Sequence, residues 1–126
     1  MKKRVVITGM GAVTPIGNSV DEFWTNAKAG TVGIDEITKF STADYKVKLA
    51  AELKDFDATA YMDRKEARRM DPFCQYAIAA SVEAMKDSGL AVTEENADRI
   101  GVIIGSGIGG LGTIEAETKK LLEKGP

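Results

Sequence analysis

Histidine is absent from this sequence of 126 residues, and cysteine occurs only once. The lack of histidine removes the commonest general base and the commonest zinc ligand, so we expect no metal site. It also excludes a hydrolase of the Ser-His-Asp or Cys-His type for this chain acting alone. A single cysteine cannot form an internal disulfide, and we therefore expect a reducing, cytoplasmic setting.

Long apolar runs and an excess of positive charge are also missing. The chain has 17 basic and 19 acidic residues, a net charge of −2, whereas a protein that wraps nucleic acid needs a basic excess. No apolar run approaches the roughly 20 residues of a membrane span. The first residues show no apolar signal-peptide core or cleavage site. We expect one globular domain with neither a nucleic-acid nor a membrane partner.

What is present is an alternation of strand and helix patterns. β-Branched, unbroken apolar runs at 4–8 and 100–104 predict strands buried on both faces, and the alternation at 46–53 predicts a further strand. Helical spacing predicts four helices, over about 20–29, from about 63, over 72–88 and over about 113–124. This order indicates an α/β fold with a mainly parallel sheet.

Several helix ends carry recognisable signals. Asn18 or Ser19 can cap the first helix, and Glu22 stands three residues after Ser19 as in a capping box. Pro72 is favoured at the first position of a helix, and Gly89 is favoured just after the last one. The intervening segment 31–45 is predicted to be a loop.

The segment Gly105–Gly110 matches the pattern G-x-G-x-x-G between a predicted strand and a predicted helix. One interpretation is a dinucleotide site, in which backbone amides cradle a pyrophosphate at the helix N-terminus. The pattern follows a late strand and lacks a ribose-binding acid on a following strand, so the alternative is a tight turn that needs positive φ. The earlier segment Gly9–Gly11 has Thr14 where a third glycine belongs, and fails as such a motif.

The run 63–71 contains three cations, Lys65, Arg68 and Arg69, at positions i, i+3 and i+4. A helix would place them on one face. Together with Arg64 they make four of the 17 basic residues; setting these four side chains aside leaves 13 basic against 19 acidic residues, a net charge of −6. The run is either a docking patch for an acidic partner or a solvated helix face.

Cys74 falls in the predicted helix 72–88, whose residues are mostly apolar. With no histidine in the chain, and with arginines only before the helix begins, nothing nearby would favour its thiolate. We interpret Cys74 as a core residue rather than a nucleophile.

Taken in order, six segments resemble the opening of the β-ketoacyl-acyl-carrier-protein synthases. They are Val5–Gly11, Thr14–Asn18, Ala51–Phe56, Arg64–Asp71, Asp87–Leu90 and Gly105–Gly110. The resemblance is to the elongating type II members of that family. It covers essentially the whole chain, which would correspond to the N-terminal segment of a longer enzyme.

The resemblance implies a thiolase-like fold of two similar halves, a homodimer, and no cofactor. It implies a decarboxylating Claisen condensation in fatty-acid synthesis, in which a cysteine takes the acyl chain from acyl-acyl carrier protein (acyl-ACP) and malonyl-ACP then attacks the thioester. The nucleophile and two histidines of the family belong to later segments, so this chain is expected to hold no catalytic residue.

Two features carry over by position. Lys65, Arg68 and Arg69 match the basic residues that the family presents to the carrier protein. Ile108, between Gly107 and Gly109, matches the side chain that gates the acyl pocket. A different class of function stays open, namely a non-catalytic thiolase-like module that binds acyl carrier protein or another acidic partner, with a dinucleotide-binding fragment as the third choice.

Overall fold

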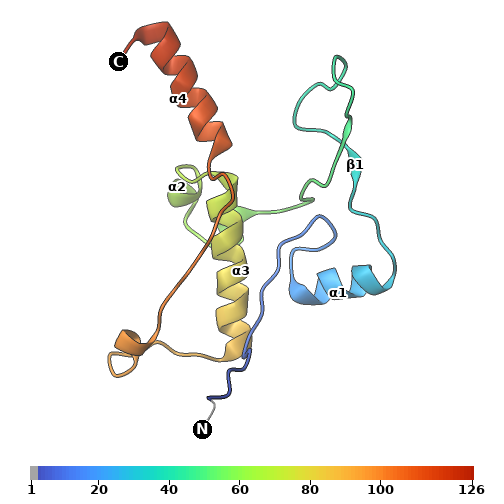
Figure 1. The fold of residues 1–126 in the computed structure, drawn as a ribbon. Coiled ribbons are helices and arrows are strands. Elements are labelled where there is room, and N and C mark those ends of the chain that lie inside the picture. Colours follow the sequence, from blue (N-terminus) through green and yellow to red (C-terminus); the bar gives the residue numbers. More distant parts are fainter. Residues whose placement is uncertain (1–2) are drawn as a thin grey trace.

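The computed structural model describes residues 3–126, and its central element is the helix α3. The elements in chain order are α1 (Val20–Lys28), β1 (Asp35–Glu36), β2 (Leu49–Ala50), a 3-10 turn (Ala58–Ala60), α2 (Arg64–Ala67), α3 (Pro72–Ser88), a second 3-10 turn (Ala97–Arg99) and α4 (Leu111–Lys124). In Figure 1, α1 and the hairpin lie on one side of α3, and α4 projects beyond its N-terminal end.

The predicted ends of α3 are confirmed. Pro72 stands at the first turn, where its missing N–H costs nothing. Gly89 ends the helix with φ of +64°, the left-handed conformation that glycine adopts most easily. The signals in the sequence therefore located both ends of this helix.

The start of α1 is a capping box displaced by one residue. The Ser19 hydroxyl accepts a hydrogen bond from the Glu22 N–H at 3.2 Å, as predicted. The Glu22 carboxylate accepts from the N–H of Asn18 at 2.8 Å, rather than from that of Ser19. The first bond satisfies a backbone donor that the first turn of a helix leaves free, and the second satisfies the N–H of the residue just before the N-cap.

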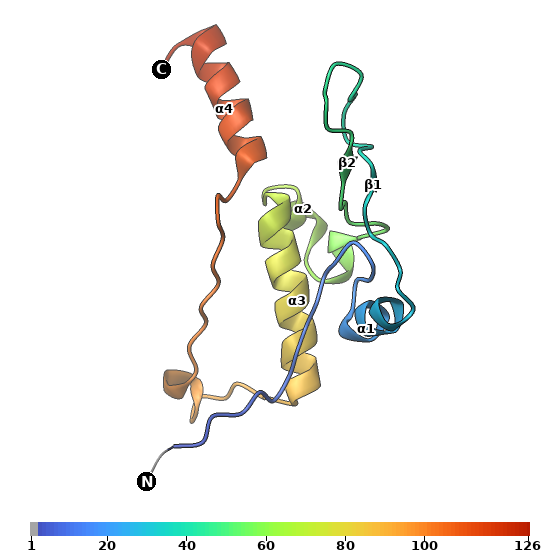
Figure 2. The same cartoon turned by 45° about the vertical axis from the view of Figure 1, so that its right-hand side comes forward.

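Gly9 and Gly11 lie directly against the backbone of α3. A Cβ on Gly11 would come within 1.9 Å of the Ala80 carbonyl oxygen, and one on Gly9 within 2.3 Å of the Ala84 carbonyl oxygen. The N-terminal segment runs along α3 in Figures 1 and 2. These glycines therefore serve close backbone packing.

Carboxylates of α3 fasten the same segment. Glu83 accepts hydrogen bonds from the N–H groups of Ala12 (2.9 Å) and Val20 (2.8 Å), so one side chain holds both the segment and the first residue of α1. Asp87 accepts from the N–H of Met10 at 2.9 Å. Bonds from backbone N–H groups to a carboxylate are about twice as strong as neutral ones.

β1 and β2 form a short antiparallel hairpin, with Asp35 opposite Ala50 and Glu36 opposite Leu49. The strand predicted over 46–53 is thus confirmed only at its centre, and the predicted loop 31–45 contains β1. Both strands have two residues, too short for the alternation of side chains to show as a pattern.

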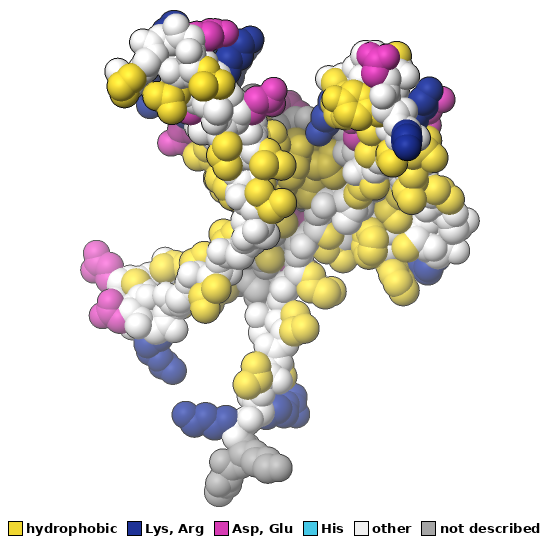
Figure 3. Space-filling model, turned by 45° about the horizontal axis from the view of Figure 1, so that its top comes forward, with side chains coloured by type: hydrophobic (Ala, Val, Ile, Leu, Met, Phe, Trp, Pro, Cys, Tyr) yellow, Lys and Arg dark blue, Asp and Glu magenta, His cyan; other side chains and the backbone are white. Residues whose placement is uncertain are grey.

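The predicted parallel sheet is not formed among residues 3–126. The runs 4–8 and 100–104 are extended, without ladder partners, and exposed: Val5 is 92% exposed and Ile103 99%. They lie apart in Figures 1 and 2, and apolar side chains stand out along separate projections of the molecule in Figure 3. The prediction that they are buried is wrong for this chain, because a parallel strand is buried only between neighbouring strands and covering helices.

None of the helices in the described part of the chain combines the length and the apolar character that crossing a membrane requires.

Candidate functional site

Lys65, Arg68 and Arg69, here called the basic patch, are all exposed. α2 ends at Ala67, so Lys65 is helical, Arg68 is the C-terminal capping residue and Arg69 lies just beyond the helix. The prediction of one helix face is therefore only partly right. Among residues 3–126, none of the three forms an ion pair. The cations are free to meet an external acidic group.

The turn that carries the basic patch is anchored from both sides. Asp63 caps α2 by accepting from the N–H of Lys65 at 2.7 Å. The side-chain amide of Gln75, in the first turn of α3, donates to the carbonyls of Ala67 (2.8 Å) and Met70 (3.2 Å). Ala67 is itself only 7% exposed. The cations thus project from a turn whose backbone is tied to α3.

The glycine-rich turn Gly105–Gly110 stands open. A Cβ on Gly105 or Gly107 would meet nothing within 4 Å, and Ile108 is 74% exposed. Gly109 has φ of +86°, and its N–H donates to the Ser106 hydroxyl at 3.0 Å. The positive φ is the conformation that glycine adopts most easily, which explains glycine at this position of the turn.

The fold brings the basic patch and the helix that follows the glycine-rich turn to one shallow pocket of about 200 Å³. Arg68 and Arg69 line it from one side, and Thr113 and Glu117 of α4 line it from the other. Between them lies Asp71, whose carboxylate accepts a hydrogen bond from the Thr113 hydroxyl at 2.7 Å. Sequence reasoning did not find this contact, since 42 residues separate the partners.

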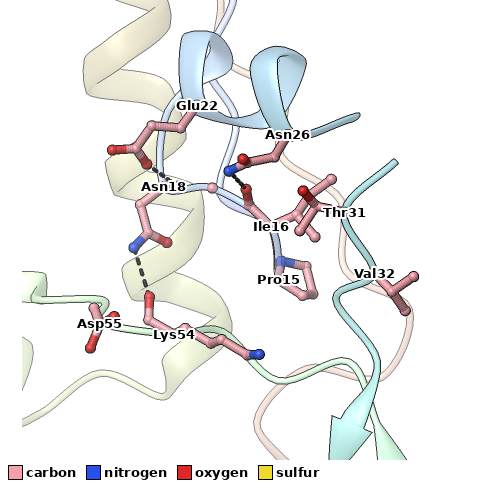
Figure 4. A pocket seen from close by; sticks show the side chains of 10 residues that line it. Pro15, Ile16, Asn18, Glu22, Asn26, Thr31, Val32, Lys54 and Asp55 are labelled. Atoms are coloured by element: carbon pink, nitrogen blue, oxygen red, sulfur yellow. Dashed lines mark hydrogen bonds between the residues drawn. The ribbon is translucent and has the colours of Figure 1, made fainter. Parts of the chain in front are cut away.

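A larger pocket of about 530 Å³ lies between α1 and the end of the hairpin (Figure 4). Its amide side chains are used to join segments: Asn18 donates to the carbonyl of Lys54 at 2.8 Å, and Asn26 donates to that of Ile16 at 2.6 Å. Asp55, at its edge, has φ of +54°. We interpret this pocket as the place where α1 and the segment after the hairpin are held together. Of its lining residues, the sequence singled out Asn18 and Glu22, both as capping residues.

Cys74 lies in the first turn of α3 and is half-buried, so its assignment to the core is met only in part. Within residues 3–126, no group of three or more histidine, cysteine, aspartate or glutamate side chains is placed to hold a metal ion.

The acids with perturbed pKa values lie away from the basic patch. Bonds from the hydroxyl and the N–H of Thr38 hold the pKa of Glu52 below its ordinary value. The pKa of Asp35 is lowered by the N–H of Glu36 and then by Lys54, and that of Asp57 by the hydroxyl and the N–H of Thr59. In each case the cause is a hydrogen bond within the hairpin or a 3-10 turn.

Known proteins are similar to this sequence over nearly its whole length. The family model described as the beta-ketoacyl synthase N-terminal domain matches residues 2–125. The chain belongs to the β-ketoacyl synthase family. The resemblance inferred from six short segments is thereby confirmed.

Curated relatives of the family are highly similar. The chain is 59% identical over 124 residues to 3-oxoacyl-[acyl-carrier-protein] synthase 2 of Staphylococcus aureus (strain COL), with 98% of the chain and 30% of the relative aligned. It is 52% identical over 125 residues to the protein of the same name from Synechocystis sp., with 99% and 30% aligned. The chain therefore spans about a third of the length of these relatives.

Solved structures of the family show the same arrangement of elements. A beta-ketoacyl synthase from Burkholderia phymatum matches with a TM-score of 0.77 and 37% identity, over 99% of this chain and 31% of that one. A ketosynthase in complex with its type II acyl-carrier protein and bound to the hexaketide matches with a TM-score of 0.78 and 34% identity, over 99% and 33%. The fold described above is thus that of one part of a ketosynthase.

Proposed function

We propose that this chain, residues 1–126, is the N-terminal segment of a 3-oxoacyl-ACP synthase that elongates fatty acids. The observation that carries the proposal is 59% identity over 124 residues to 3-oxoacyl-[acyl-carrier-protein] synthase 2. In the complete enzyme a cysteine thiolate outside this segment takes the acyl group from acyl-ACP. Malonyl-ACP then loses carbon dioxide, and the resulting carbanion attacks the acyl thioester carbonyl and expels the thiolate.

Within this scheme the segment supplies a docking surface for the carrier protein rather than a catalytic group. The basic patch is exposed and unpaired in the described part of the chain, and it stands on an otherwise acidic polypeptide. Rim charges of this kind chiefly accelerate encounter, and their reach is about one Debye length, ~8 Å at physiological salt. An acidic carrier protein would supply the complementary charge.

Charge reversal in the complete synthase tests the docking role. Changing Lys65, Arg68 and Arg69 to Glu should raise the KM for acyl-ACP about tenfold and flatten its dependence on ionic strength, because the patch acts through long-range attraction. Transfer from a small acyl thioester without carrier protein should hardly change. If both substrates suffer equally, the patch is a structural or merely solvated surface.

A matched control is the triple reversal of Lys39, Lys46 and Lys48, three exposed lysines in the hairpin region. This variant changes the net charge by the same amount. It should leave the KM for acyl-ACP within about twofold, since rim charges matter only near the docked partner. A tenfold effect there would mean that total charge, not the basic patch, governs the encounter.

We further propose that Ile108, flanked by Gly107 and Gly109, gates the acyl pocket of the complete enzyme. Replacing it with Phe should spare short acyl primers and slow long ones about tenfold or more, because overpacking costs ~1–3 kcal/mol. Rates measured across primer lengths decide the matter. Equal slowing of every primer would make Ile108 an ordinary packing residue.

The segment alone should catalyse no condensation and should not become acylated, since it has no histidine and the family nucleophile lies elsewhere. Its exposed apolar side chains, among them Ile7 and Ile103, should also favour aggregation. Intact-mass analysis after incubation with acyl-ACP checks the first point. An adduct that is lost in the Cys74→Ser variant would contradict it.

The complete enzyme is proposed to be a cytoplasmic homodimer with a thiolase-like fold and no cofactor. In it the runs 4–8 and 100–104 should lie in a mainly parallel mixed sheet, because unbroken β-branched runs suit strands covered on both faces. Hydrogen exchange should then be slow at both runs, and light scattering should give twice the mass of one chain. Rapid exchange at both runs would rule the sheet out.

A further inference from the structure

The carboxylate of Asp71 turns away from its own helix. Asp71 stands at the N-cap of α3, a position where aspartate commonly accepts a bond from the helix that follows, yet it makes no such bond here. Its oxygen Oδ2 instead accepts from the Thr113 hydroxyl of α4 at 2.7 Å. The side chain therefore joins two helices that are distant in sequence.

The start of α4 needs such a partner. Gly110 is its N-cap residue and has no side chain to satisfy the first turn. A negative charge near a helix N-terminus is favoured by the aligned peptide dipoles. Asp71 thus supplies from α3 the charge that the cap of α4 lacks.

Gly110 is also fitted to this carboxylate. A Cβ at Gly110 would come within 1.8 Å of Oδ2 of Asp71. The φ of Gly110 is −86°, an angle that other residues adopt readily, so its backbone conformation does not require glycine. The space that glycine leaves is the space that the Asp71 carboxylate occupies.

The two segments for which roles are proposed above meet at this contact. Asp71 directly follows the turn of the basic patch, which Gln75 of α3 holds in place. Thr113 lies one helical turn after Gly109, the positive-φ residue of the glycine-rich turn. The Asp71–Thr113 bond is the side-chain hydrogen bond that ties the second segment to the first among the described residues.

We propose that Asp71 is a positioning residue: through Thr113 it sets the placement of the glycine-rich turn, and thereby how the complete synthase discriminates primers by length. The proposal rests on the gating role proposed above for Ile108. Asp71 touches neither substrate nor a reacting atom. Asp71 acts indirectly: it holds the start of α4, and the glycine-rich turn directly precedes that helix.

Variants of Thr113 in the complete synthase test this proposal. Thr113→Val keeps the shape of the side chain and removes the donor, whereas Thr113→Ser keeps the donor. The ratio of long-primer to short-primer rates should shift about fivefold in Thr113→Val and stay within about twofold in Thr113→Ser, because loss of one charge-assisted bond changes an equilibrium by roughly that factor or more. The KM for acyl-ACP should stay within about twofold in both, since the basic patch is intact.

A second substitution disrupts the Asp71–Thr113 contact from the side of Asp71. Gly110→Ala places a methyl group where the Asp71 carboxylate lies, and should shift the primer ratio in the same direction as Thr113→Val. In the double variant the two effects should not add, because both substitutions break the same Asp71–Thr113 hydrogen bond. Gly112→Ala is the matched control, since its Cβ would lie at an ordinary 3.5 Å from Oδ1 of Asp71.

The outcomes separate this proposal from the gate itself. If Ile108→Phe shifts the primer ratio while Thr113→Val and Gly110→Ala do not, the positioning role of Asp71 is overturned and the gate stands. If none of the three variants shifts the ratio, the gate is wrong and the positioning role falls with it. Equal loss of rate for all primers in Thr113→Val, not rescued by Thr113→Ser, would also overturn the proposal.

Discussion

Two glycine-containing segments look alike in the sequence and behave oppositely in the structure. Gly9 and Gly11 press against the carbonyls of α3, with no room for a Cβ on either. Gly105 and Gly107 face open space, and only Gly109 adopts a positive φ in that segment. Close packing against α3 explains the first pair. Nothing in the described part of the chain would contact a Cβ on Gly105 or Gly107, so we expect the reason for these glycines to lie in a contact of the complete enzyme.

The largest loss of stability is expected from a substitution in the packed segment around Gly9 and Gly11. Gly11→Ala forces a Cβ to 1.9 Å from the Ala80 carbonyl oxygen, and both are backbone positions that cannot rotate away. Overpacking of this kind costs typically ~1–3 kcal/mol, and more when a backbone must move. Thermal denaturation of the complete synthase should show a clear fall in Tm, which Gly112→Ala in α4 should not share.

A smaller loss is expected when the fastening of that segment is weakened. Glu83→Gln retains one carbonyl oxygen where the carboxylate now serves the N–H groups of both Ala12 and Val20. Leaving one donor poorly paired costs about 1–3 kcal/mol. Denaturant unfolding can be compared with that of Glu94→Gln, an exposed residue whose side chain makes no hydrogen bond in the described part of the chain. Equal midpoints would mean that the two bonds to Glu83 contribute little to holding the segment.

The open segment should respond in function rather than in stability. Gly107→Ala meets no atom within 4 Å, and its stability effect should stay within about 0.5 kcal/mol. If the turn borders the acyl pocket of the complete synthase, the added methyl should slow long primers more than short ones. A fall in Tm as large as that of Gly11→Ala would remove the contrast between the two segments.

The smallest effect on stability is expected from a change of pH that protonates Glu52, in the hairpin region outside both glycine-containing segments. The bonds from Thr38 lower the pKa of Glu52, so this carboxylate stabilises the folded state fully above its ordinary pKa. That contribution is lost as the pH falls through the lower, folded value. An NMR titration should show the Thr38 amide signal moving over that acidic range, and not in Glu52→Gln. Movement near neutral pH instead would contradict the direction of the shift.

Prediction from sequence succeeded where the cause is local. The ends of α3 follow from Pro72 and Gly89, and the cap of α1 follows from Ser19 and Glu22, because each signal acts within one turn. It failed for α2, where the spacing of the basic patch suggested a helix reaching Arg69 although the helix ends at Ala67. Residues spaced at i, i+3 and i+4 lie on one helix face only if all of them are within the helix.

Pairing of strands was the other failure. The runs 4–8 and 100–104 have the composition of buried strands, and they are exposed in this chain. Whether a strand is buried depends on the strands and helices packed against it, and the residue pattern of the strand alone does not show whether these are present.

The sequence by itself determined the family of this protein and the positions of its long helices, since these depend on residue type and local order. Only the tertiary structure decided that Gly11 serves packing, that Glu83 joins two segments and that Asp71 serves α4 rather than α3. These contacts span 42 to 71 residues of chain. Such distant partners meet only once the chain is folded, and no local propensity specifies which of them will.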